Sequence, residues 1–198
     1  ELAIDKGYYE SFQGSPFSQG ILQFDMWNVS PSNRWDWNTL KSKIKEYGTR
    51  NSLVTALMPT ASTSQILGNN ECFEAYTRNL YTRKTNAGEY TIINKHLYND
   101  LNYLELWTDE IKNKLIKNYG SIQNINDIPQ IIKNLYKTVW EIPQKVIVDQ
   151  AISRGPYVDQ SQSMNIYMAT PNMSRLHKSH FYGWKNGLKT GMYYLHSK

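Results

Sequence analysis

The sequence predicts an α/β fold, because short apolar runs typical of strands alternate with amphipathic segments typical of helices. An amphipathic segment that ends at Gly48 is followed by the apolar run of residues 52–57, and a second helix can begin at Ser64. Helix, strand, loop and helix in this order are typical of α/β domains. The 198 residues, 40% of them hydrophobic, are enough for one domain or a large piece of one.

The first helix is expected at residues 38–47, where apolar residues recur at helical spacing as far as Tyr47. Asp36 or Asn38 can cap its start, and Gly48 can supply the left-handed residue that ends it. Further helices are expected at four places: residues 96–106, 109–118, 131–136 and 176–186. The amphipathic run of residues 139–152 contains Pro143, which should kink or divide it.

Strands are expected at six places: residues 52–57, 80–83, 90–93, 157–159, 164–168 and 189–195. The second and third of these flank Asn86, Ala87 and Gly88, so they should form a hairpin with the glycine at a positive φ. Residues 7–27 are rich in Gly, Ser and Pro and are expected to consist of loops and turns.

Charge and cysteine content limit the classes of function. The net charge of +5 is spread without a block of like charges, so a basic patch for nucleic acid is not expected. Cys72 is the single cysteine, which excludes an internal disulfide and a multi-cysteine zinc site and suits a reducing compartment. No apolar run is long enough for a membrane span. The chain begins at Glu1 without an initiator Met or a signal peptide, and we expect it to be a fragment.

Pro59, Thr60, Ala61, Ser62 and Thr63 join an expected strand to an expected helix. The start of a helix offers unpaired backbone N–H groups and a positive dipole end, both of which suit a phosphate. Small side chains let a phosphate approach, and the hydroxyls add donors. Composition alone favours a simpler alternative, in which these residues only cap the helix. The Gly-rich stretch and Lys of a Walker-type loop are absent.

Tyr193 and Tyr194 place two phenols next to each other in the last expected strand. Adjacent side chains of a regular strand face opposite sides, so the phenols could stack only at a bend or at the end of the strand. Because the chain has 15 tyrosines, two ordinary half-buried tyrosines are the simpler interpretation.

Two long segments resemble the large subunit of eukaryotic-type class I ribonucleotide reductases. They are NSLVTALMPTASTSQILGNNE at residues 51–71 and HFYGWKNGLKTGMYYL at residues 180–195. Between them, three shorter motifs lie in the order and at the spacings of the family: residues 79–83, 135–141 and 158–163. Residues 14–16 and 20–27 fit as well, so the resemblance covers essentially the whole chain.

The resemblance implies that residues 1–198 are the carboxy-terminal part of a ten-stranded α/β barrel. The family reduces ribonucleoside diphosphates to deoxyribonucleoside diphosphates, starting from a cysteine thiyl radical and drawing electrons from a cysteine pair. Residues that match Pro59 to Thr63 bind the phosphates of the substrate. Residues that match Tyr193 and Tyr194 relay the radical, and Tyr194 is the one nearer the small subunit.

The resemblance also implies the partners of the parent protein. They are a small subunit whose di-iron/tyrosyl cofactor supplies the radical, a second large subunit in a homodimer, the nucleoside diphosphate substrate, and thioredoxin or glutaredoxin. ATP and dATP are expected as allosteric effectors on parts of the parent chain outside this sequence. No cofactor or metal ion is expected to bind this chain directly, and the expected location is cytoplasmic.

The chain departs from the family pattern in its cysteines. The catalytic motif Asn-Leu-Cys-x-Glu, the redox cysteine pair, the ATP-binding cone and the Cys-containing tail do not occur in it. Cys72 is expected to be a small, half-buried residue without a redox role. The isolated chain is therefore expected to be inactive.

Other polar residues are weaker candidates. His177 and His180 could offer half of a metal site, but surface or capping histidines are favoured. Glu71 and Glu74 could form an acid/base pair, although their spacing is nonspecific, and residues 159–163 are expected to satisfy hydrogen bonds at a strand end. The alternative function for the whole chain is a non-catalytic phosphate-binding or interaction module.

Overall fold

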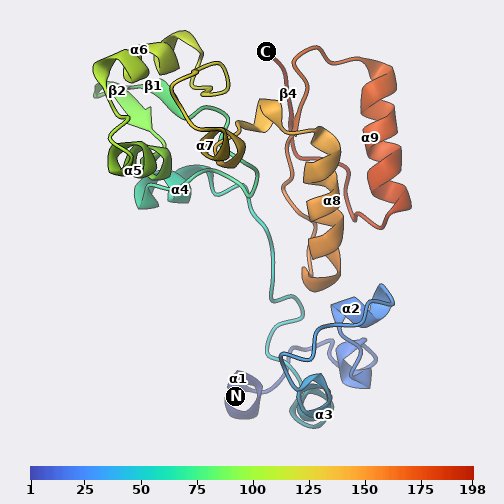
Figure 1. Cartoon of the computed structure of the whole chain (residues 1–198). Coiled ribbons are helices and arrows are strands. Elements are labelled where there is room, and N and C mark those ends of the chain that lie inside the picture. The colour runs from blue at the N-terminus through green and yellow to red at the C-terminus, as the bar shows by residue number, and fades with distance from the viewer. The chain divides into compact units, whose positions relative to one another are not determined.

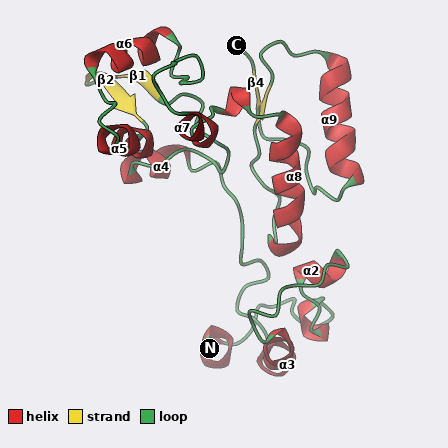
Figure 2. Ribbon diagram, viewed as in Figure 1, coloured by secondary structure: helices red, strands yellow, loops and turns green.

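The computed structural model describes residues 1–198 and contains α-helices, short 3-10 helices and four strands (Figures 1 and 2). The chain divides into two compact units. Unit 1 comprises Glu1–Pro59, Val148–Met164 and Asn172–Tyr193, and unit 2 comprises Thr60–Ile147, Asn165–Pro171 and Tyr194–Lys198. None of the helices is long and apolar enough to cross a membrane.

Unit 1 is mainly helical. Its elements are α1 Leu2–Lys6, η1 Phe17–Gln19, α2 Gln23–Met26, α3 Trp37–Tyr47, the larger part of α8 Gln144–Arg154, η3 Gly155–Tyr157 and α9 Met173–Lys185. Two of these, α3 and α9, confirm expected helices, although α9 begins three residues earlier than expected. The Asp36 side chain accepts a hydrogen bond from the Thr39 amide at 3.0 Å, so Asp36 caps α3. The short helices η1 and α2 lie in a segment that is expected to contain only loops.

A small apolar core holds the amino-terminal part of unit 1 together. Phe12, Leu22, Phe24 and Ile44 are buried in it. The Phe24 ring meets the Trp37 ring edge-on, with 5.0 Å between the ring centroids. Burying an apolar side chain of this size stabilises a fold by about 1.5–3 kcal/mol, so these four buried side chains explain how this part of the unit is held together.

Unit 2 contains the remaining elements. They are α4 Ala61–Leu67, β1 Leu80–Thr85, β2 Gly88–Ile93, α5 Lys95–Tyr103, α6 Asp109–Lys117, α7 Gln130–Leu135, η2 Val139–Glu141, β3 Ile166–Tyr167 and β4 Leu195–His196. The largest apolar core of the unit forms where α5 and α6 turn their i, i+4 apolar pairs inward. Its buried members include Leu97, Leu101, Ile111, Leu115, Ile122 and Ile125.

The expected hairpin and the helices after it are confirmed. Strands β1 and β2 pair antiparallel, with Thr85 opposite Gly88, whose φ is 137°. The Thr108 side chain accepts a hydrogen bond from the Ile111 amide and so caps α6. Gly120 follows α6 with a φ of 82°, and a Cβ there would lie 2.8 Å from the Leu80 carbonyl oxygen. Only glycine meets both conditions.

Pro143 divides the amphipathic run of residues 139–152, as expected. Helix η2 ends at Glu141, Ile142 is extended, and α8 begins at Gln144. A proline within a continuous helix would lack a backbone donor and clash with the preceding turn. The residue before a proline is pushed toward extended conformations, which explains why the break falls at Ile142.

Four of the six expected strands are wrong in extent. Residues 52–57 form only an isolated parallel bridge, Leu57 to Gln162, and residues 157–159 form no strand. The other two shrink to the two-residue strands β3 and β4. One physical reason is visible at residues 54 and 55, whose amides donate to the side chain of Asp159 instead of to a neighbouring strand.

The pairings that do form near these segments are parallel. In unit 1 the Gln160 amide donates to the Thr55 carbonyl and the Ser163 amide to the Leu57 carbonyl. In unit 2, β3 and β4 pair in parallel, with Ile166 opposite Leu195. Parallel strands need a crossover connection, usually through helices. The mixture of helices and strands thus agrees with the expected α/β class.

Candidate functional site

The segment from Pro59 to Thr63 leads into α4. Thr60 is the residue before the helix and has a φ of 52° and a ψ of 27°, a left-handed conformation that is unusual for a β-branched residue. Its side chain makes no capping hydrogen bond. The first backbone bond of the helix runs from the Ser64 amide to the Thr60 carbonyl at 2.8 Å. The amides of the three residues between them therefore lie ahead of the helical ladder.

Exposure and capping bonds bear on the two interpretations of this segment, phosphate binding and simple helix capping. Ala61, Ser62 and Thr63 are exposed, whereas Pro59 and Thr60 are half-buried. Capping by the hydroxyl of Thr60 is excluded, because that side chain does not accept from the helix. What remains is an exposed helix start with small and hydroxyl-bearing side chains, and its role in phosphate binding stays a prediction.

Tyr193 and Tyr194 lie in an irregular segment just before β4, where a regular strand is expected. In unit 1 the Tyr193 amide donates to the Met164 carbonyl at 2.6 Å. In unit 2 the Tyr194 carbonyl accepts from the Ile166 amide at 2.9 Å, and the Tyr194 ring lies edge-on to His196 at 6.1 Å. The exposed fractions of the two tyrosines are 47% and 57%. The backbone of both is thus held while the side chains remain accessible.

Asp159 joins two distant segments of unit 1. Its Oδ2 accepts hydrogen bonds from the Val54 amide at 2.7 Å and from the Thr55 amide at 2.9 Å. The Asp159 amide in turn donates to the Thr55 hydroxyl oxygen at 2.9 Å. Asp159 satisfies backbone hydrogen bonds as expected, although residues 157–159 form no strand at whose end it could lie. Sequence reasoning did not identify which backbone it holds, because 104 positions separate Asp159 from Thr55.

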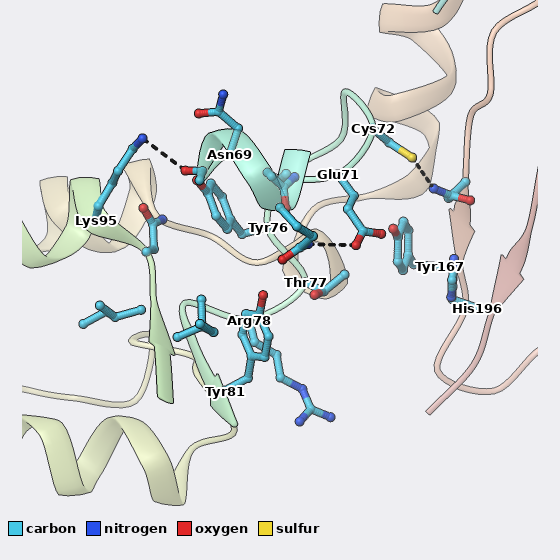
Figure 3. A pocket seen from close by; sticks show the side chains of 18 residues that line it. Asn69, Glu71, Cys72, Tyr76, Thr77, Arg78, Tyr81, Lys95, Tyr167 and His196 are labelled. Carbon is cyan, nitrogen blue, oxygen red and sulfur yellow. Dashed lines mark hydrogen bonds between the residues drawn. The ribbon is translucent and has the colours of Figure 1, made fainter. Parts of the chain in front are cut away.

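Unit 2 contains a cavity of about 420 Å³ (Figure 3). Its lining comes from the end of α4, the loop after it, strands β1 and β2, and two later segments. The polar lining residues include Glu71, Cys72, Tyr76, Arg78, Lys95, Asn165, Tyr167 and His196. The Tyr167 and His196 rings stack on each other at 4.8 Å with 12° between their planes. Burial and the nearby Glu74 raise the pKa of the Tyr167 phenol, so this phenol stays neutral at physiological pH.

Glu74 and Cys72 meet Asn165 beside this cavity. The Asn165 amide donates to Glu74 Oε1 at 2.7 Å. The side-chain Nδ2 of Asn165 donates to Cys72 Sγ at 3.1 Å, and Figure 3 marks this bond with a dashed line. Burial raises the pKa of Glu74. Burial, and then the charge of Glu74, raise the pKa of the Cys72 thiol. A thiol held in its protonated form is a poor nucleophile, which agrees with the expectation of a half-buried cysteine without a redox role.

The remaining candidates of the sequence have separate partners. Glu71 accepts from Gln65 at 2.9 Å, whereas Glu74 accepts from Asn165, so they do not share a site. The exposed His177 ring packs against Phe181 at 5.1 Å. No group of three or more His, Cys, Asp or Glu side chains is arranged to hold a metal ion.

Matches to known proteins identify the family of the chain. The family model described as "Ribonucleotide reductase, barrel domain" matches residues 1–194. The chain therefore belongs to the ribonucleotide reductase barrel-domain family. Within that family, it is similar to large subunits of eukaryotes and of a virus, and the resemblance of the sequence to such subunits is confirmed over the whole chain.

Three relatives illustrate the similarity. The chain is 59% identical over 198 residues to the ribonucleoside-diphosphate reductase large chain of Neurospora crassa and 59% identical to the large subunit of Arabidopsis thaliana. It is 57% identical over 198 residues to the large subunit of vaccinia virus. Each match covers 100% of this chain but only 21%, 24% and 26% of the relative, respectively. The chain thus spans about a quarter of the length of these relatives.

A solved structure supports the same assignment. The class Id ribonucleotide reductase alpha subunit of Actinobacillus ureae is similar with a TM-score of 0.67 and 33% sequence identity. The match covers 78% of this chain and 28% of that subunit.

Proposed function

We propose that the chain is the carboxy-terminal part of the barrel of a ribonucleotide reductase large subunit. The intact protein reduces ribonucleoside diphosphates to deoxyribonucleoside diphosphates. The observation that carries this proposal is the identity of 57–59% to such subunits along the whole chain, which includes the segments of both candidate sites.

Pro59 to Thr63 are the proposed binding site for the substrate's phosphates. The support is chemical: an exposed helix start offers amides ahead of the helical ladder, and Ser62 and Thr63 add hydroxyl donors beside them. The left-handed backbone conformation of Thr60 is further support for a binding site here. Such a conformation costs about 1–3 kcal/mol, and residues of this kind cluster at ligand-binding and active sites.

Tyr193 and Tyr194 are the proposed radical relay, with Tyr194 nearer the small subunit and Tyr193 nearer the catalytic cysteine. A phenol can lose its proton and an electron together, so each transfer moves no net charge through a medium where charge is costly. Cys72 is not proposed as the cysteine that receives the radical, because it does not lie in the Asn-Leu-Cys-x-Glu motif of the family and its sulfur accepts a hydrogen bond from Asn165.

The proposed partners follow from the family. A small subunit with a di-iron/tyrosyl cofactor supplies the radical, two large subunits form a dimer, and thioredoxin or glutaredoxin returns the reducing electrons. ATP and dATP act on other parts of the parent chain, and the protein works in the cytoplasm. This chain contributes orientation and electrostatics and binds no cofactor itself.

The proposal is tested with the full-length large subunit and its small subunit. Formation of deoxyribonucleoside diphosphate is measured by chromatography, and substrate affinity by isothermal titration with a ribonucleoside diphosphate. We expect Ser62→Ala to weaken substrate binding by about tenfold, in line with the loss of one hydrogen bond to a charged group. Ser42→Ala on the exposed face of α3 is the matched control. Normal affinity in the Ser62 variant would remove the phosphate assignment.

A further inference from the structure

Lys189 closes a turn in unit 1. Its ammonium group donates to the carbonyl oxygens of Gly155 at 3.3 Å, Asp159 at 3.4 Å, and Val158. The nitrogen also lies 4.7 Å from the centroid of the Trp27 ring, over its face. An ammonium has three N–H donors, so these three carbonyls use its full capacity. Lys189 therefore fixes the backbone of residues 155–159, called here the 155–159 turn.

The same turn holds a second segment through the carboxylate of Asp159. That carboxylate binds the amides of Val54 and Thr55 and accepts from the Thr55 hydroxyl at 3.3 Å. Thr55 lies four positions before Pro59. A hydrogen bond from the Ser163 amide to the Leu57 carbonyl, at 3.0 Å, holds the backbone just before Pro59.

Packing cannot hold residues 53 and 54, because Leu53 is 51% exposed and Val54 is 68% exposed. Without a buried apolar face, hydrogen bonds must fix this segment. A carboxylate that accepts several N–H and O–H donors gives stronger bonds than a neutral oxygen does. The Asp159 carboxylate thus adds charged hydrogen bonds at Val54 and Thr55 to the backbone bonds that Gln160 and Ser163 make with the same segment.

We propose that Asp159 and Lys189 are positioning residues that hold two functional segments on one turn. Asp159 fixes the approach to Pro59, and Lys189, four positions before Tyr193, fixes the turn and the start of the segment that carries this tyrosine. This inference rests on the proposed function, since it assigns roles toward the phosphate site and the relay. Both act through the backbone segments that they hold.

The test uses the full-length large subunit with its small subunit, and measures kcat and KM for a ribonucleoside diphosphate. We expect Asp159→Ala to raise KM by about tenfold and to change kcat by less than about twofold, because only the phosphate segment shifts. Asp159→Asn keeps one oxygen in place and should restore most of the affinity. Adding Thr55→Val to Asp159→Ala should raise KM by a smaller factor than Thr55→Val does alone, because the hydroxyl has already lost the carboxylate and keeps only the Asp159 amide as a close partner.

Lys189 should behave differently. Lys189→Met should raise KM and also lower kcat by about tenfold, since both segments lose their common anchor. Lys189→Arg keeps the charge and several donors and should recover part of both parameters. Lys112→Met, on the exposed face of α6, is the control and should leave both parameters unchanged.

Ser62→Ala in the same assay distinguishes a failure of the positioning inference from a failure of the proposed function. If Ser62→Ala raises KM and Asp159→Ala does not, the positioning inference is wrong while the proposed function stands. If neither variant raises KM, both fail. If Asp159→Ala and Asp159→Asn lower kcat equally and leave KM alone, the carboxylate acts only on the stability of the fold, and the inference is again overturned.

Discussion

Glu74 is a buried carboxylate whose nearest donors come from a residue 91 positions away in the sequence. Its Oε1 accepts from the Asn165 amide, and its Oε2 lies 3.3 Å from Asn165 Nδ2. The Asn165 Oδ1 atom is buried without a hydrogen-bond partner. A glutamine at position 74 has a side-chain NH₂ group. It could donate a hydrogen bond to the Asn165 Oδ1 atom once the side-chain amide of Asn165 has flipped.

A consequence of this burial is a pH-dependent loss of stability. Burial raises the pKa of Glu74 above its ordinary value of 4.5. Below that value the carboxyl is protonated in both folded and unfolded chains and carries no penalty. As the pH rises above 4.5, the unfolded chain releases this proton first, so the stability of the folded state falls until the raised pKa is passed.

We therefore expect Glu74→Gln to unfold at a higher denaturant concentration than the wild type at pH 7.5, with the difference shrinking toward pH 4.5. The exposed Glu71→Gln removes the same formal charge and is the control. Denaturant unfolding followed by fluorescence at several pH values measures the effect. Parallel pH profiles for the wild type and Glu74→Gln would show that burial of this carboxyl does not govern stability.

At the scale of elements, local signals predicted helices well and strands poorly. The Thr108 cap, the Pro143 break and the Gly88 turn depend on residues within a few positions, and the structure has all three where they were expected. Strands 52–57 and 189–195 depend on partners far along the chain. The residue pattern shows that such a run is apolar, but it does not show whether another strand pairs with it by hydrogen bonds.

Removal of the Thr108 cap is the prediction at this scale. Thr108→Ala leaves the Ile111 amide without its side-chain acceptor and should destabilise α6 by about 1 kcal/mol. Thr108→Ser keeps the oxygen and should be close to the wild type. Hydrogen exchange of the first amides of α6 is the direct measurement, and unchanged protection in Thr108→Ala would contradict the cap.

The whole chain exposes many large apolar side chains. Those more than half exposed include Leu53, Val54, Ile66, Leu67, Met173, Phe181 and Trp184. Large apolar side chains exposed in this number often belong to surfaces that meet another surface.

The resemblance of the sequence to the family predicted both candidate segments, Pro59 to Thr63 and Tyr193 with Tyr194. The contacts of Lys189 with the 155–159 turn became visible only in the structure, because no local sequence pattern pairs a lysine with distant carbonyls.

We expect the isolated chain of 198 residues to bind a hydrophobic dye and to self-associate as its concentration rises. It should also form no deoxyribonucleotide, because Cys72, its single cysteine, cannot replace a radical cysteine and a redox pair. Light scattering, dye fluorescence and product chromatography measure the three properties. A monomer that does not bind dye, or any product, would contradict this expectation.

Turnover of Tyr193→Phe and Tyr194→Phe in the full-length large subunit, assayed with its small subunit, tests the central claim most directly. Phenylalanine keeps the ring but has no phenolic O–H to oxidise, so each variant should lose turnover to the background level while substrate affinity stays within about twofold of the wild type. Normal turnover in either variant would contradict the relay, and with it the role proposed for this end of the chain.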